Sequence, residues 1–229
     1  MLFKSQVYTQ ASGSVGGLTY SHNAGGMYTR SRTIPTNPAT AAQVAVRNAM
    51  SQLVVRWGTT LTAVQRNAWA VYAANTPVVN ALGDAVNRSG QQMFLRGNVI
   101  RVQEGAPEAD DGPTTFDLGG FTAPTFSVSE ATQLISVGFE DTDLWANEDD
   151  SFAAVSASRP QSPGVNFFKG PYRRAGTIDG DAVTAPTSPQ TIAVPFPVVA
   201  GQKLFLEFRV SRVDGRLSSP FRGGVTVAA

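Results

Sequence analysis

The apolar residues of this 229-residue chain change their spacing once, and that change limits what the chain can fold into. Between residues 36 and 105 they recur every three or four positions, which is the period of an amphipathic helix. After a segment rich in Gly, Pro and Asp at 105–113 they recur at every second position, which is the period of a β-strand. We therefore expect an α+β protein, with a small three-helix domain followed by an all-β sandwich.

The first helix is expected to run to Trp57 and to end at Gly58, because glycine favours the position just after a helix. Its start has two candidates: Asn37 as N-cap before Pro38, or Thr40 with Gln43 as a capping box. One face of this helix is apolar, and it consists of Val46, Ala49, Met50, Leu53, Val54 and Trp57.

The second helix is expected to begin after Thr62, with Gln65 completing a capping box, and to end before Pro77. Its inner face is predicted to hold Val64, Ala68, Val71 and Tyr72, with Trp69 beside them. The short Gly-Thr-Thr connection predicts antiparallel packing against the first helix. A third helix, capped by Ser89, offers Met93, Phe94, Gly97 and Ile100; a glycine inside a helix predicts a close backbone approach at that point.

Residues 1–35 are predicted to form an extended arm. Two short alternating segments at 15–20 and 27–32 flank a loop with two glycines, which predicts a β-hairpin. The arm has few residues able to form a core, so it is expected to be either disordered or ordered by lying on another surface. The division expected for the chain is an arm at 1–35, a basic helical domain at 36–105, a linker at 106–121 and a β-sandwich at 122–229.

Eight strands are expected in the second half, and Gly and Pro separate them as in all-β sandwiches. Leu204, Leu206, Phe208 and Val210 share one parity while Phe205 has the other, so this strand is expected to be covered on both faces. The layout resembles a fibronectin type III or related immunoglobulin-like sandwich, and the segment 212–220 is similar to the last hairpin of that class. The expected strands are 126–129, 134–139, 152–157, 166–168, 173–178, 191–195, 204–210 and 225–227.

Composition excludes several classes of protein. There is no cysteine, so disulfides, thiolate metal sites and a cysteine nucleophile are excluded. His22 is the one histidine and lies in the arm, so it is interpreted as a surface or contact residue. We expect no secretory signal and no membrane span. The sequence predicts no catalytic residue, no cofactor and no metal site; Ca²⁺ at the acidic groups 140–143 and 148–150 is the weaker alternative to solvated loops.

Charge divides the chain into halves of opposite sign. Residues 1–105 carry nine basic residues and two acidic ones, whereas residues 106–229 carry nine and fifteen. The arginines of the basic half could pair with carboxylates of a neighbouring subunit or of the acidic half, or grip nucleic-acid phosphates. Pairing is the preferred interpretation, because no Lys/Arg-rich run and no base-stacking motif accompanies them. Trp57, Trp69 and Tyr72 are expected to pack in the helical core rather than to stack on bases.

Several segments together resemble a group of uncharacterised phage and prophage proteins. They are Gly17-Leu18-Thr19-Tyr20, Arg30-Ser31-Arg32, Pro35-Thr36-Asn37-Pro38 with Gln43 and Arg47, Trp57, Leu61-Thr62, Gln65 to Trp69, and Ser89-Gly90 with Phe94. The third-helix match is looser, since Gly90-Gln91-Gln92-Met93 stands where Gly-Tyr-Gln is common.

The resemblance implies a virion-associated or assembly protein and implies no catalytic residue. We therefore expect a non-enzymatic structural protein of a phage-like virion, made in the host cytoplasm, with other virion structural proteins and further copies of itself as partners. A nucleic-acid-binding or packaging accessory is the alternative. The residues expected to bind the partner are Tyr20, Tyr28, Arg30, Arg32, Arg47, Arg56 and Arg66.

Overall fold

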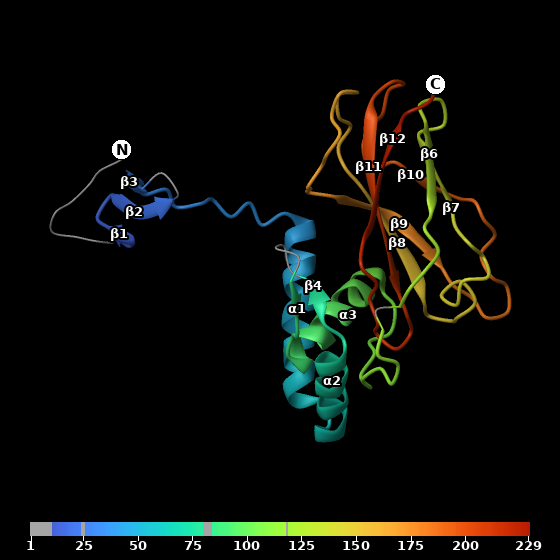
Figure 1. Cartoon of the computed structure of the whole chain (residues 1–229), viewed down its shortest axis with the longest axis horizontal. Coiled ribbons are helices and arrows are strands. Elements are labelled where there is room, and N and C mark those ends of the chain that lie inside the picture. Colours follow the sequence, from blue (N-terminus) through green and yellow to red (C-terminus); the bar gives the residue numbers. More distant parts are fainter. Residues whose placement is uncertain (1–10, 24–25, 80–83, 118) are drawn as a thin grey trace. The chain divides into compact units, whose positions relative to one another are not determined.

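A computed structural model describes residues 11–23, 26–79, 84–117 and 119–229 of the chain. The chain forms two compact units, Met1–Ala41 and Ala42–Ala229. The first contains a small β-sheet, and the second contains three helices together with two larger antiparallel sheets (Figure 1). The protein is therefore of mixed α+β class, as the change in apolar spacing predicts.

The first unit contains a three-stranded antiparallel sheet: β1 (Gly13–Val15), β2 (Leu18–Asn23) and β3 (Gly26–Ser31). The predicted hairpin is confirmed, but its strands are shifted toward the turn, because Ser21 and His22 pair with Tyr28 and Met27. The segment 15–20 is not one strand. Gly16 adopts a φ of 56°, which is the left-handed region that glycine tolerates, and the chain reverses there to add β1.

The three predicted helices are α1 (Ala41–Thr59), α2 (Ala63–Asn75) and α3 (Gly90–Glu104). The capping box of Thr62 and Gln65 is confirmed, and Ser89 caps α3 in the same way with Gln92. Of the two predicted starts, Thr40 agrees with the structure, because α1 begins at Ala41. The Asn37 start is wrong, since the Asn37 side chain accepts a hydrogen bond from the Ala39 amide before the helix starts. The predicted end is also wrong, because Gly58 lies inside α1 without a positive φ.

An aromatic cluster holds the helices together. Trp69 and Phe94 meet edge to face at a centroid distance of 5.6 Å, and Trp57 lies 5.4 Å from Phe94. This confirms core packing for Trp57, Trp69 and Tyr72. The predicted inner face of α2 is partly wrong, because Val64 is 79% exposed and Val71 is 43% exposed. The bulky Trp69 sets the orientation of α2, so the residues three and four positions later, Tyr72 and Ala73, are buried with it.

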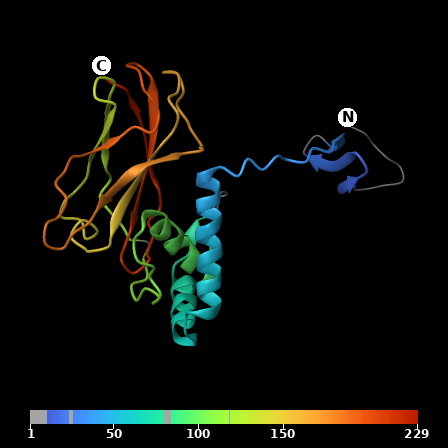
Figure 2. The same cartoon turned by 180° about the vertical axis from the view of Figure 1, so that it is seen from behind.

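The chain reverses between α1 and α2, and α2 runs back beside the C-terminal half of α1 (Figures 1 and 2). The Arg66 guanidinium reaches the last turn of α1 and donates to the carbonyl oxygens of Trp57 and Gly58. The antiparallel arrangement is thus as predicted. A two-stranded hairpin, β4 (Val78–Val79) with β5 (Ala85–Val86), connects α2 to α3.

The second half of the chain forms two antiparallel sheets, with strand orders β12-β11-β8-β9 and β10-β7-β6. Buried side chains from both sheets, including Ile135, Val155 and Leu206, belong to one hydrophobic cluster, so the sheets face each other across a common core. The strands are β6 (Thr125–Ser129), β7 (Leu134–Gly138), β8 (Phe152–Ala157), β9 (Arg173–Asp179), β10 (Gln190–Ala193), β11 (Lys203–Ser211) and β12 (Phe221–Thr226).

Seven of the eight predicted strands are present, and β11 is covered on both faces as expected. The strand predicted at 166–168 is wrong. Phe168 instead stacks on Phe205 at a centroid distance of 5.7 Å, so this loop covers the outer face of β11. The last strand begins at Phe221 rather than at Val225, because Phe221 pairs with Phe208 at the end of the hairpin.

Helix α3 joins the helices to the sheets, and both views show it between the strands and the other two helices (Figures 1 and 2). A Cβ atom on Gly97 would lie 2.1 Å from the Gly215 carbonyl oxygen, in the loop between β11 and β12. The predicted close backbone approach is therefore confirmed. Residues 42–229 form one compact unit, and the segment 106–121, expected to be a linker, contacts both its helices and its strands.

Substitution of Gly97 by Ala tests this contact. We expect Gly97→Ala to lower the free energy of unfolding by about 1–3 kcal/mol, because neither backbone can move without disturbing its own element. Gly58→Ala is the matched control: its Cβ would meet nothing within 4 Å. In an exposed helix this change should stabilise the protein by up to about 1 kcal/mol. Urea unfolding of both variants measures the difference, and equal stabilities would contradict the close approach.

Candidate interaction surface

Helix α1 carries an apolar stripe that faces solvent. Val46, Met50 and Val54 are spaced four residues apart and are 42%, 39% and 45% exposed. Of the six residues in the predicted apolar face, only Ala49 and Leu53 are buried. The structure thus places α1 with one edge of its apolar face against the protein and leaves the other edge uncovered. Exposed apolar side chains that gather in one patch are typical of interaction sites.

A salt bridge holds α1 in this orientation. The Arg56 guanidinium donates two hydrogen bonds of 2.7 Å to the Asp110 carboxylate, and Gln52 donates to Glu108 at 3.0 Å. The hydrogen bond to Asp110 raises the pKa of Arg56 above its ordinary value. Both carboxylates belong to the segment 106–121, so this acidic segment ties α1 to the rest of the second unit. A bidentate pair of this kind also fixes the angle of the helix.

A groove of about 590 Å³ lies beside the N-terminal half of α1. Its walls come from α1, from the C-terminal half of α3 and from the outer face of β8 and β9. The apolar side chain of Val46 belongs both to the stripe and to the groove, so the two form one continuous surface. The other groove residues that matter here are Ile100, Val102, Ala154 and Tyr172.

The sheet of the first unit has two chemically different faces. Residues paired across antiparallel strands share a face, so the register places Val15, Leu18, Tyr20 and Met27 together, with His22, Thr29 and Ser31 on the same face. The opposite face holds Ser14 and Thr19, whose hydroxyls are 2.8 Å apart, with Tyr28 and Arg30. Between residues 11 and 40 no described residue is buried. This three-stranded sheet therefore has an apolar face but no core of its own among the described residues.

The seven residues predicted to bind a partner lie in different environments. Tyr20 is on the apolar face of the first sheet, whereas Tyr28 and Arg30 are on its polar face, and Arg32 follows in the exposed chain. Arg47 is exposed on α1 beside the apolar stripe. Their role in binding stays a prediction. The remaining two, Arg56 and Arg66, use their guanidinium groups for the internal contacts described above.

Two other arginines of the basic half lie on α3 and contact the second half of the chain, Arg96 half-buried and Arg101 buried. Arg96 donates to the carbonyl oxygens of Leu217 and Ser218, and burial, with a smaller contribution from Arg209, lowers its pKa to about 10. Arg101 is 1% exposed, and burial lowers its pKa too. The sequence grouped both with arginines available to phosphates or neighbouring subunits. That interpretation is wrong for these two, because a helical period alone does not show which face the sheets cover.

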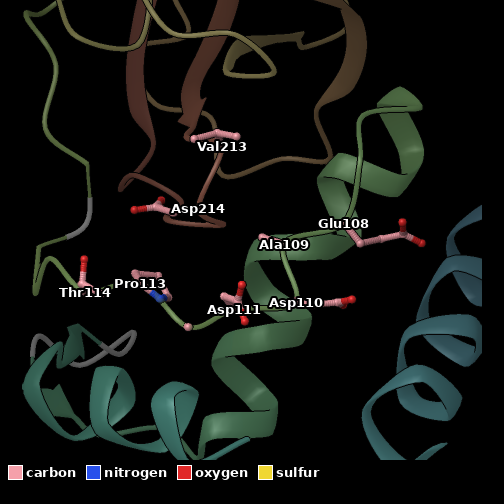
Figure 3. A pocket seen from close by; sticks show the side chains of 9 residues that line it. Glu108, Ala109, Asp110, Asp111, Pro113, Thr114, Val213 and Asp214 are labelled. Atoms are coloured by element: carbon pink, nitrogen blue, oxygen red, sulfur yellow. The ribbon is translucent and has the colours of Figure 1, made fainter. Parts of the chain in front are cut away.

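A depression of about 500 Å³ lies along the acidic segment 108–114 and the loop that carries Asp214 (Figure 3). Its carboxylates do not converge: Glu108 and Asp110 point toward α1, while Asp214 lies on the opposite side (Figure 3). Asp111 accepts a hydrogen bond from Gln65 and Asp214 is paired with Arg216. These acids act as partners of the helices and loops rather than as a set of ligands around one point.

The acidic loops considered for Ca²⁺ have similar internal roles. Asp143 accepts two hydrogen bonds from Thr122, and Glu148 is paired with Arg212 at 2.6 Å. Among the described residues no group of three or more His, Cys, Asp or Glu side chains could hold a metal ion. None of the described helices is long and apolar enough to span a membrane.

Comparison of the chain with protein-family models, with curated proteins and with solved structures finds no match.

Glu148 should make stability depend on pH. Burial alone would raise its pKa, but hydrogen bonds from Arg212 and Ser151 outweigh burial and hold the pKa below its ordinary value. A lowered pKa stabilises the folded state fully above the pKa of the unfolded chain, about 4.3 for glutamate, and this contribution is lost as the pH falls further. We expect the free energy of unfolding to decline below about pH 5.

In Glu148→Gln this part of the acid dependence should be absent. Asp141→Asn, an exposed residue of the same loop, serves as the control and should retain the acid dependence of the unmodified protein. Urea titrations between pH 3 and pH 7 measure the effect. The same pH dependence in Glu148→Gln as in the unmodified protein would contradict the assignment.

Proposed function

We propose that this protein is a non-enzymatic structural component of a phage-like virion, and that it docks onto other virion proteins through its N-terminal sheet and its helices. The observation that carries the proposal is the sheet at residues 13–31, which gathers Val15, Leu18, Tyr20 and Met27 on one face and in which no described residue is buried. Full burial of one large apolar side chain contributes about 1.5–3 kcal/mol, so burial of these four on a partner would contribute several kcal/mol to docking.

The position of this sheet in the chain suits docking. It belongs to a compact unit separate from Ala42–Ala229, and the residues between Ser31 and Ala41 contain no helix or strand. Ten residues of extended chain span at most about 35 Å. The arm can therefore reach a neighbouring protein while the second unit keeps its own contacts. The similarity of residues 13–105 to phage and prophage proteins supports a virion as the place where this happens.

For residues 122–229 we propose a fibronectin type III-like sandwich that is exposed on the particle or contacts the next copy. The strand orders β10-β7-β6 and β12-β11-β8-β9 support this fold, because they follow the arrangement of three and four strands expected for that class. A hairpin between β11 and β12 stands where the last hairpin of the class is expected. Function is not fixed by such a fold, so the sandwich itself carries no further assignment.

Nucleic-acid binding was the alternative, and no arrangement of the described residues favours it. Arg56, Arg66, Arg96 and Arg101 have acceptors within the chain. Proteins that bind DNA through phosphates lose affinity steeply as salt is raised. Salt-dependent DNA binding by the full chain would restore this alternative.

The proposal is tested with particles purified from the cells in which this protein is made. Mass spectrometry should find the chain in them. Leu18→Asp, which places a charge on the apolar face, should reduce its incorporation at least tenfold, because a buried unpaired carboxylate costs several kcal/mol. Thr19→Asp, on the polar face of the same strand, is the matched control and should be incorporated normally. Particles that lack the unmodified chain would contradict the proposed function.

A further inference from the structure

We propose that the exposed stripe of α1, Val46, Met50 and Val54, binds the same stripe of a second copy, so that two α1 helices pack antiparallel about a two-fold axis at Met50. This inference rests on the proposed function as a structural protein and names one of its interfaces. The arm docks on other proteins in that proposal, whereas α1 joins two copies of this chain.

The stripe is symmetric in sequence. Val46 lies four residues before Met50 and Val54 lies four residues after it, so a two-fold axis at Met50 places each valine of one copy opposite the other valine of its partner. An interface between identical copies must be self-complementary in this way. Residues four apart on a helix lie on one side of it, and the stripe is about 12 Å long. A parallel arrangement would not use this symmetry.

The charges around the stripe are compatible with a second copy. Helix α1 contains no Asp or Glu, and Arg47 is its one exposed charged residue. In the antiparallel pair, each Arg47 lies near Val54 of the partner, and the two copies of residue 47 are about 9 Å apart along the helix axis. At physiological salt most of the repulsion at this distance is screened. The apolar centre at Met50 contains no charge from either copy.

The stripe is accessible to a partner helix within the second unit. Figure 2 shows α1 in the foreground, with α2 and α3 behind it and the strands to one side. The Arg56 pair with Asp110 and the packing of Leu53 fix the inner edge of α1, so the stripe does not need to rotate before binding. Preorganisation of this kind reduces the entropic cost of association.

The contact is small, and this sets the expected affinity. Stable interfaces bury about 1,200–2,000 Å² in total, and two helices of this length bury less. We therefore expect a reversible dimer with a dissociation constant of roughly 10–100 μM. Many copies on one particle raise the effective concentration, so a weak contact is sufficient there.

The absence of cysteine from the chain permits a direct test. A disulfide requires Cα atoms about 4.4–6.8 Å apart. The two copies of residue 50 meet at the two-fold axis of the proposed helix pair, so we expect their Cα atoms to lie within this range. In the full-length protein, Met50→Cys should form a covalent dimer under mild oxidation at about 50 μM. Val64→Cys, on the exposed side of α2, is the matched control and should cross-link at least tenfold less. Equal cross-linking of both variants would indicate random collision and overturn the proposal.

The direction of packing is tested by mixing. Val46→Cys alone and Val54→Cys alone should cross-link poorly, because each residue lies about 12 Å along the axis from its own symmetry mate. A mixture of the two variants should cross-link efficiently, as Val46 faces Val54 of the other copy. Efficient cross-linking of either variant alone, with no mixed Val46–Val54 dimer in the mixture, would show parallel packing and overturn the arrangement.

Charge provides a second measurement that needs no oxidation. Met50→Glu and Met50→Lys should each be monomeric by sedimentation at about 100 μM, while an equimolar mixture should form a heterodimer, because only the mixture places opposite charges at the axis. Finding only the mass of the monomer in the mixture would contradict the proposal. If the cross-linking and charge tests fail but the chain is found in particles, only the proposed dimer is overturned. If the chain forms the dimer but is absent from particles, only the proposed virion function is overturned.

Discussion

The close contact between α3 and the loop at Gly215 is the constraint on which the second unit depends. Gly97 has no side chain where the two backbones meet, and Arg101, one turn later on α3, is buried. The Arg101 guanidinium donates to three backbone carbonyl oxygens, those of Pro107, Asp150 and Arg212. A buried cation is costly unless it is hydrogen-bonded, so these carbonyls must be held in place. Helix, acidic segment and strands are therefore parts of one packed structure.

This packing explains why one edge of α1 is held against the second unit while the other edge is exposed. The acidic segment leaves α3 at Gly105 and supplies Asp110 to Arg56, which attaches α1 by one edge. The other edge, with Met50 at its centre, is exposed among the described residues of the second unit. The first unit is different, because its sheet has several apolar side chains on one face but no buried residue among those that the structure describes. Two surfaces of different design in one chain fit a protein that contacts more than one neighbour.

Local features could be predicted from the sequence wherever neighbouring residues decide them. The capping boxes at Thr62 and Ser89 were predictable because the cap and its partner are three residues apart, and the end of α2 because Pro77 stops it. Gly97 was predictable as a close approach, but not as an approach to Gly215. The end of α1 was not predictable from Gly58, since glycine permits a helix end without requiring one. The interpretation of the arginines was wrong where their hydrogen-bond acceptors are backbone carbonyl oxygens of residues far away in the sequence.

By itself, the sequence determined the class of the protein: three helices, then strands, with caps, turns and a basic arm, because periodicity and turn chemistry are local. The tertiary structure alone decided which apolar residues are covered. Val46, Met50 and Leu53 belong to one apolar face in the sequence, yet only Leu53 is buried, because the Arg56 pair and the aromatic cluster set the rotation of α1. Which edge of a helix stays exposed depends on contacts between residues far apart in the chain, and a local pattern does not contain them.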